Sequence, residues 1–209
     1  KIENIWGLNR LKKNCKKTGL IPIAVYGAAF AGKDTGSIIR DVAHKIRMIE
    51  AAIELKCNRI VATGYAGRPD WGLDSAVQVL KEIIPMAEKY NIDICLENHY
   101  NFSFETIDDY KEIFSRISSD KLGVCVDTGH FYASGINLLE VADTLNEKIN
   151  HIHLKDCKKG TEDKFSFVNF GEGETNNVKF LKKMIDEYDY EGYMTFELAI
   201  EDKTKVVEN

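Results

Sequence analysis

The chain has 209 residues, of which 44% are hydrophobic and 29% charged, and this composition suits one well-buried domain and excludes a mostly disordered chain. A net charge of -5, from 28 basic and 33 acidic residues, argues against a nucleic-acid-binding protein, which usually has a basic excess. No apolar run approaches the roughly 20 residues that span a bilayer, and no signal peptide is recognised, so we expect no membrane partner. The five scattered cysteines lack CxxC spacing, which favours a reducing, cytoplasmic location without disulfides.

Short β-rich runs alternate with helix-periodic segments along the whole chain. We predict seven strands, at residues 2–6, 21–26, 59–63, 92–97, 122–127, 151–155 and 193–198. Most of these runs are almost continuously apolar, as in parallel strands that are covered on both faces. Apolar residues spaced three and four apart predict helices at residues 8–17, 37–55, 73–90, 106–117, 138–145 and 177–188. No linker-like composition divides the chain, so we expect residues 1–209 to form one domain.

Serial strand–helix units fit two architectures, a closed (β/α)8 barrel and an open doubly wound sheet. The open sheet usually carries a glycine-rich phosphate loop after its first strand. Here Gly27, Gly32 and Gly36 match neither the GxGxxG pattern nor the P-loop pattern. The signal typical of the open sheet is therefore absent.

Four residues of metal-ligand type lie at or near the ends of four different predicted strands: Glu97, Asp127, His153 and Glu197. In a parallel barrel those ends converge on one face, where the active site is built. Three carboxylates at one point would repel one another strongly unless a cation compensated them. One imidazole with three carboxylates suits a divalent cation such as Mn2+, Mg2+, Co2+ or Zn2+.

Five short strings carry a resemblance to a known family: LENH at 96–99, VDTGH at 126–130, HIHLKD at 151–156, GEG at 171–173 and TFE at 195–197. In order and spacing, the chain resembles the xylose isomerase-like TIM-barrel superfamily, and more narrowly its sugar phosphate isomerase/epimerase branch. The resemblance implies a (β/α)8 barrel with a divalent metal held by Glu97, Asp127, His153 and Glu197. It also implies isomerisation or epimerisation of a small sugar or sugar phosphate.

The chemistry of these residues agrees with that activity. A metal that chelates a carbonyl and its neighbouring hydroxyl makes the adjacent C–H more acidic, and a carboxylate can then remove the proton. In the epimerases that the chain resembles, two metal-bound glutamates on opposite sides of the substrate move this proton. They correspond to Glu97 and Glu197, which we predict to be catalytic.

Further polar residues near the same strand ends are candidates for substrate binding. We predict substrate contacts for His99 and His130, with a second metal or a hydrogen bond to Asp127 as alternative roles for His130. Lys155 has the phase of His153 and is suited to an oxyanion or a phosphate. His151 has the same phase one step deeper, where we expect a barrel-interior residue.

Two long loops are expected on the same face. In residues 64–71, Arg68 is suited to an anion and Trp71 to a sugar ring. Asp156 precedes the second loop, residues 157–176, and we expect it to orient that loop. The phenylalanines within residues 165–170 fit either an apolar lid over the site or ordinary loop packing.

Other functions remain open at this point. A dehydratase of a cyclic polyol or dehydroshikimate-like acid would use the same metal and base. The superfamily also includes three-zinc apurinic-site endonucleases, but residues 165–167 (Phe-Ser-Phe) have no metal ligand where those enzymes have a DxH pattern. A catalytically silent metal- or sugar-binding domain is the alternative from outside the enzymes.

The strand count bears on the fold. Family members typically approach 250 residues, and residues 2–6 read as the second barrel strand. We therefore expect a barrel that lacks its first strand and most of its last helix. An exposed edge would favour pairing with another chain, which keeps a homo-oligomer among the expected partners.

Overall fold

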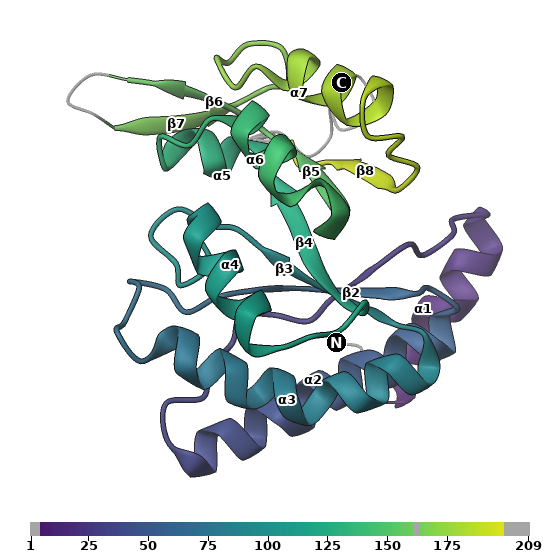
Figure 1. The fold of residues 1–209 in the computed structure, drawn as a ribbon. Coiled ribbons are helices and arrows are strands. Elements are labelled where there is room, and N and C mark those ends of the chain that lie inside the picture. Colours follow the sequence, from purple (N-terminus) through teal and green to yellow (C-terminus); the bar gives the residue numbers. More distant parts are fainter. Residues whose placement is uncertain (1–4, 161–163, 199–209) are drawn as a thin grey trace.

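The computed structural model describes residues 5–160 and 164–198, and its centre is a curled half-barrel of parallel strands (Figure 1). Six strands form one sheet in the order β1-β2-β3-β4-β5-β8, and every neighbouring pair is parallel. Their bounds are β1 Val25–Tyr26, β2 Arg59–Thr63, β3 Asp93–Glu97, β4 Leu122–Asp127, β5 Ile149–Leu154 and β8 Tyr193–Phe196. Six of the seven predicted strand regions are thus confirmed, although only two residues of the 21–26 run pair with a neighbour.

Helices alternate with the strands and cover the outer face of the sheet (Figure 1). They are α1 Ile5–Thr18, α2 Thr35–Leu55, α3 Gly72–Tyr90, α4 Ile107–Arg116, α5 Thr128–Ala133, α6 Leu138–Leu145 and α7 Asn177–Asp186, with a 3-10 turn at Asn146–Lys148. All predicted helices except α5 were expected within a few residues of these bounds. In the described part of the chain, no helix is both long and apolar enough to cross a membrane.

Local side-chain bonds fix where several helices begin. The Asp34 carboxylate accepts a hydrogen bond from the Ser37 backbone N–H at 2.9 Å, and the Ser37 hydroxyl accepts one from the Asp34 N–H, which forms a capping box for α2. Thr106 caps α4 in the same way. Helix α3 begins differently from our expectation, because Asp74 lies within its first turn rather than at the cap position.

The strand predicted at residues 2–6 is wrong where the structure describes it, because residues 5 and 6 already belong to α1. Leu8 is buried and Leu11 packs against the core. Their spacing from one another and from Cys15 is helical, and this period overrides the short β-rich run before it. Residues 1–4 lie outside the described residues.

A second difference lies in the region predicted as a long loop after β5. Strand β6 (Asp156–Lys159) and strand β7 (Phe165–Val168) form an antiparallel hairpin that projects from the barrel (Figure 1). The hairpin lies beside the carboxyl ends of the strands, where it contacts α5.

A charged side chain crosses the concave side of the sheet and ties distant strands together. Arg59 of β2 is only 6% exposed, and its guanidinium donates a hydrogen bond to the Asn150 carbonyl of β5 at 2.6 Å. It lies 3.4 Å from the His151 Nδ1 atom and 5.1 Å from the centre of the Tyr193 ring of β8. Because Arg59 links β2 to β5 and β8, it supports the curl that brings the strand ends together.

Replacement of this arginine should therefore weaken the fold. We expect Arg59→Met to lower the free energy of unfolding by about 1–3 kcal/mol, since the buried Asn150 carbonyl loses its partner. The matched control is Arg116→Met, whose half-exposed guanidinium pairs with Asp74 and Glu112 and should contribute about 0–1 kcal/mol. Urea unfolding of both variants measures the difference, and equal losses would contradict the role given to Arg59.

Candidate metal centre

The sheet brings the four predicted ligands to one point. Glu97 and Asp127 end β3 and β4, His153 lies one residue before the end of β5, and Glu197 directly follows β8. One ligand atom from each of the four lies within 4.8 Å of the others. Asp127 is fully buried, whereas the Glu197 side chain is 47% exposed, so the cluster opens toward solvent on the Glu197 side.

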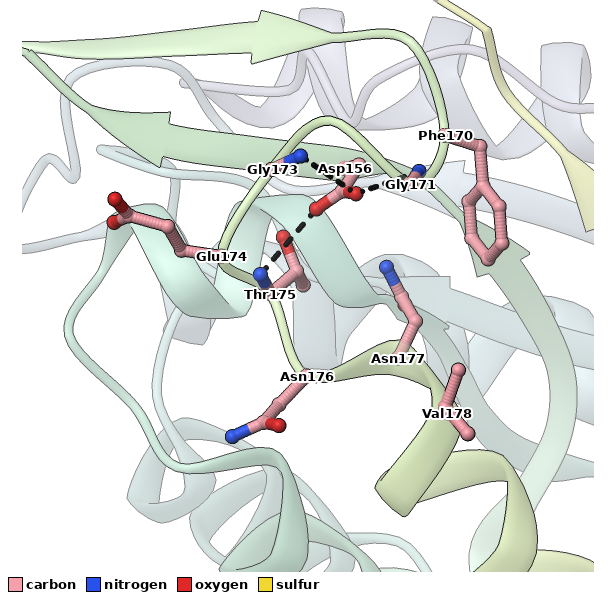
Figure 2. Close-up of a pocket in the computed structure, with 9 residues that line it drawn as sticks. All are labelled: Asp156, Phe170, Gly171, Gly173, Glu174, Thr175, Asn176, Asn177 and Val178. Atoms are coloured by element: carbon pink, nitrogen blue, oxygen red, sulfur yellow. Dashed lines mark hydrogen bonds between the residues drawn. The ribbon is translucent and has the colours of Figure 1, made fainter.

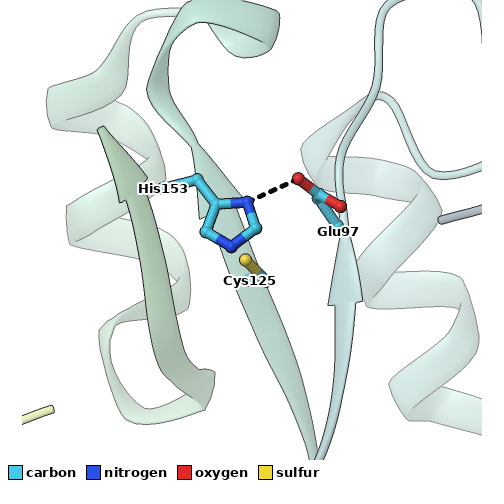
Figure 3. A group of neighbouring side chains, drawn as sticks. All are labelled: Glu97, Cys125 and His153. Carbon is cyan, nitrogen blue, oxygen red and sulfur yellow. Dashed lines mark hydrogen bonds and ion pairs between the residues drawn. The ribbon is translucent and has the colours of Figure 1, made fainter. Parts of the chain in front are cut away.

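The imidazole of His153 connects the two glutamates. Its Nδ1 atom lies 2.7 Å from Glu97 Oε1 (Figure 3) and 3.4 Å from Glu197 Oε2. Burial alone would lower the pKa of His153, but hydrogen bonds to Glu197 and Glu97 outweigh it and raise this pKa to about 9. The hydrogen bond from His153, together with Lys155, lowers the pKa of Glu197 below its usual range against the opposing effect of burial.

Asp127 has the strongest electrostatic demand in the cluster. Burial raises the pKa of its carboxyl group to about 7, although the nearby Lys155 ammonium and the His130 backbone N–H act in the opposite direction. Its Oδ2 atom is buried and has no hydrogen bond of good geometry. The Lys155 Nζ atom, however, lies 3.1 Å from this oxygen and 2.9 Å from Glu197 Oε1. The protein itself therefore places a cation against two of the carboxylates.

The donor set fits one divalent cation. Three carboxylates and one imidazole form an oxygen-rich shell, and the orphaned Asp127 Oδ2 atom is an acceptor that a cation would satisfy. The model contains no ions. The residues suited to hold the cation are Glu97, Asp127, His153 and Glu197, as the spacing of the strand ends predicted.

Asn98 contributes to this arrangement in a way that the sequence analysis missed. Its side-chain oxygen accepts a hydrogen bond from the Asp127 N–H at 2.7 Å, and its side-chain nitrogen donates to the Asp127 carbonyl at 3.0 Å. Asn98 thereby fixes the end of β4 against the end of β3. Its only sequence signal was its place in the LENH string.

A thiol lies just below the cluster. Cys125 of β4 is fully buried, and its sulfur can be grouped with Glu97 and His153 as a second set of potential ligand atoms (Figure 3). Burial, reinforced by the nearby Glu97 charge, raises the pKa of this thiol well above its usual value. A protonated thiol in this position acts as a small apolar side chain at the floor of the site.

The two candidate histidines stack on one another beside the cluster. The His99 and His130 ring centres are 3.7 Å apart, and His99 Nε2 lies 3.9 Å from Glu97 Oε1. The Tyr100 N–H donates a hydrogen bond to His130 Nδ1 at 3.2 Å, so neutral His130 carries its proton on Nε2. Burial lowers the pKa of His130 to about 3, which keeps the ring neutral and makes Nε2–H a hydrogen-bond donor.

The other two substrate-binding candidates make different contacts. The Arg68 guanidinium binds Asp109 through two hydrogen bonds of 2.8 and 2.9 Å and also contacts Glu105 at 3.1 Å. The Trp71 ring packs edge-on against Tyr65, with ring centres 4.9 Å apart. Arg68 thus anchors the loop before α3 to α4, and neither residue has a recorded contact with the four-residue cluster.

Asp156 shapes the loop that follows the hairpin, as expected. Its carboxylate accepts hydrogen bonds from the N–H groups of Gly171 and Gly173 at 2.9 and 3.0 Å, and from Thr175 at 3.3 Å (Figure 2). A Cβ atom on Gly173 would lie 2.1 Å from Asp156 Oδ1, so only glycine fits there. His151 also has the expected interior position, because it is buried and its Nε2 atom lies 3.2 Å from the Thr195 hydroxyl.

This combination of parallel half-barrel and clustered strand-end ligands defines the class of the protein. The model of the xylose isomerase-like TIM barrel family matches residues 3–208, and the chain belongs to that family.

Curated relatives cover several activities. The chain is 33% identical over 162 residues to the uncharacterized protein MJ1311 of Methanocaldococcus jannaschii (71% of this chain, 53% of that protein). It is 25% identical over 146 residues to an inosose dehydratase of Clostridium beijerinckii (64% and 48%). It is 27% identical over 201 residues to a probable endonuclease 4 of Mycoplasma genitalium (87% and 68%). The chain thus spans about half the length of the first two relatives.

Solved structures agree on the fold. A D-tagatose 3-epimerase-like protein matches with a TM-score of 0.78 and 27% identity, over 99% of this chain and 81% of that one. A structure described as the IolI protein with a binding zinc atom matches with a TM-score of 0.79 and 22% identity, over 95% and 75%. The latter likeness shows the fold alone.

Loss of one cluster carboxylate should weaken metal binding selectively. We expect Asp127→Asn to lower the affinity for Mn2+ or Zn2+ at least about tenfold, because a buried anionic ligand is replaced by a neutral amide. Asp120→Asn, at an exposed position outside the cluster, is the matched control and should bind like the native chain. Calorimetric titration measures both, and unchanged affinity in Asp127→Asn would contradict the proposed ligand set.

Metal stabilisation should also depend on pH. In the metal-free protein the raised pKa of His153 gives stability that is fully present below pH 6.5 and is lost as pH rises through about 9. The raised pKa of Asp127 acts in the same direction between 3.8 and about 7. Protons and a divalent cation compete for these groups. We therefore expect the Tm gain from Mg2+ to grow between pH 6.5 and about 9, whereas a gain independent of pH would contradict this coupling.

Proposed function

We propose that the chain is a divalent-metal-dependent isomerase or epimerase of a small sugar or sugar phosphate. The observation that carries the proposal is the convergence of Glu97, Asp127, His153 and Glu197 on one point within 4.8 Å. The similarity to a D-tagatose 3-epimerase-like protein supports the same reaction class. The sugar itself, its phosphorylation and the physiological metal are not part of the proposal.

The residues divide the work by position. The bound cation would polarise the substrate carbonyl and so make the neighbouring C–H acidic. Buried Glu97 and half-exposed Glu197 supply two carboxylates, one to remove the proton and one to return it. His130 offers its Nε2–H to a substrate oxygen, and the Lys155 ammonium is within reach of negative charge beside Glu197. Substrate contacts of His99, Arg68 and Trp71 stay predictions.

Solvent isotope exchange tests the proton transfer. With Mg2+ or Mn2+ present, the native chain should incorporate deuterium from D2O into a ketose of a panel such as D-tagatose, D-fructose and D-fructose 6-phosphate. We expect Glu97→Gln and Glu197→Gln each to slow exchange by about 10²–10⁴-fold. Glu140→Gln, at an exposed position on α6, is the control. Full exchange in both cluster variants, with metal content verified by elemental analysis, would refute the assignment.

A dehydratase is the second candidate, favoured by the similarity to the inosose dehydratase of C. beijerinckii. The same carboxylate could remove a proton next to a carbonyl, and a β-hydroxyl could then leave as water. Mass spectrometry of the product separates the reactions, because isomerisation leaves the mass unchanged and dehydration lowers it by one water.

A nuclease is less well supported despite the similarity to a probable endonuclease 4. Among the described residues, the metal-ligand groups that gather all share Glu97 and His153, so a three-metal site is not assembled there. The net charge of -5 also gives poor steering toward phosphates. A cytoplasmic location, in keeping with the five free cysteines, and a homo-oligomer stay predictions.

A further inference from the structure

A cavity of about 430 Å³ lies beside the metal centre, between the β6–β7 hairpin and the loops that follow β3 and β4. This volume is in the range of small-molecule sites. Aromatic and imidazole rings dominate its lining, which consists of His99, Tyr100, Phe102, His130, Ala133, Lys164, Phe165 and Phe167. Among the described lining residues, Lys164 alone carries a formal charge and none is a carboxylate or an amide.

The rings form a continuous, mutually supported wall. His99 stacks on His130, and the edge of Phe167 meets His130 with ring centres 4.7 Å apart. Phe165 packs between Tyr100 and Tyr132, at 6.1 and 6.2 Å. Rings held on several sides are positioned before a ligand arrives, so little side-chain entropy is lost on binding.

The hairpin presents both phenylalanines to this cavity for a simple geometric reason. Successive side chains of a strand point to opposite faces, so Phe165 and Phe167 share one face of β7 while Ser166 and Val168 share the other. Phe167 remains 40% exposed although it is a large apolar side chain. A partly exposed ring at a cavity mouth has apolar area still available for a ligand.

The cavity and the metal centre share a wall. The Phe167 ring centre is 4.8 Å from the Lys155 Nζ atom, which contacts Asp127 and Glu197 directly. On the other side, the His99 ring lines the cavity and approaches Glu97 to 3.9 Å. A ligand with one end at the four-residue cluster can therefore extend into the cavity without a gap.

The two compartments suit chemically different groups. The cluster offers carboxylates and an ammonium to hydroxyl and carbonyl oxygens. The cavity offers mainly ring faces and edges, where a polyhydroxylated group would lose hydrogen bonds to water with few replacements. A flat apolar group, in contrast, gains both burial and ring stacking there.

We propose that the substrate is a sugar derivative with an aromatic or similarly flat apolar substituent, which binds in the cavity walled by Phe165 and Phe167 while the sugar lies at the metal centre. The position of the sugar rests on the proposed function. Phe165 and Phe167 then determine specificity, because they select for the substituent without taking part in proton transfer.

Two probes with the same sugar test this selection: phenyl β-D-glucopyranoside and methyl β-D-glucopyranoside. Saturation-transfer NMR with the Mg2+-loaded protein should show about tenfold tighter binding of the phenyl probe, with the strongest transfer to its ring protons. Phe167→Ala and Phe165→Ala should each remove most of that preference and leave binding of the methyl probe unchanged. Val168→Ala, on the opposite face of β7, should keep the native preference.

Equal affinity of the two probes, including no binding of either, would overturn the proposal, as would a preference that survives both phenylalanine substitutions. Circular dichroism checks that the variants are folded. The measurement needs no turnover, so it separates the two proposals. A phenyl preference without isotope exchange would refute only the isomerase assignment, and exchange without the preference would refute only the cavity assignment.

Discussion

The structure depends on one electrostatic constraint, the placement of three carboxylates around a single point at the edge of a parallel sheet. Asp127 is fully buried and Glu97 almost so, and neither could remain ionised there without compensating positive charge. The chain answers this demand with His153 and Lys155, both from β5 and its end. The raised pKa values of His153 and Asp127 are two consequences of the same crowding.

The scaffold holds this crowded charge by contacts between neighbouring and distant strands. Asn98 binds the backbone of Asp127 from the next strand, so the two carboxylate-bearing strand ends keep a fixed register. Deeper in the sheet, Arg59 reaches β5 and β8 and supports the curl. The site is therefore positioned by strands rather than by loops, which restricts the motion of its side chains.

The sequence was most informative where a regular period and a strand end coincide. Strands such as β2 and β4 were predicted to the residue, because their apolar runs are bounded by polar residues on both sides. The clustering of the four potential ligands followed from the barrel geometry alone, whereas their roles rested on the family resemblance and stay predictions.

Other features depended on partners that are far away in the sequence. Arg68 binds Asp109, and nothing in either local sequence pairs them. The role of Asn98 depends on the register between β3 and β4. The β6–β7 hairpin was interpreted as a loop, although the alternation of Phe165, Ser166 and Phe167 is typical of a strand. Helix α1 was hidden at its start by a short β-rich run.

The position of Lys155 has a thermodynamic consequence. Because its ammonium already neutralises Asp127 and Glu197, binding of a divalent cation is an exchange between a tethered cation and a free one. The measured affinity then reports the difference between two ion contacts, not the strength of the new contact by itself. A chain that carries its own counterion also avoids exposing its fold to an unbalanced buried charge whenever the free ion is scarce. The site can therefore combine a dense set of carboxylates with reversible metal binding.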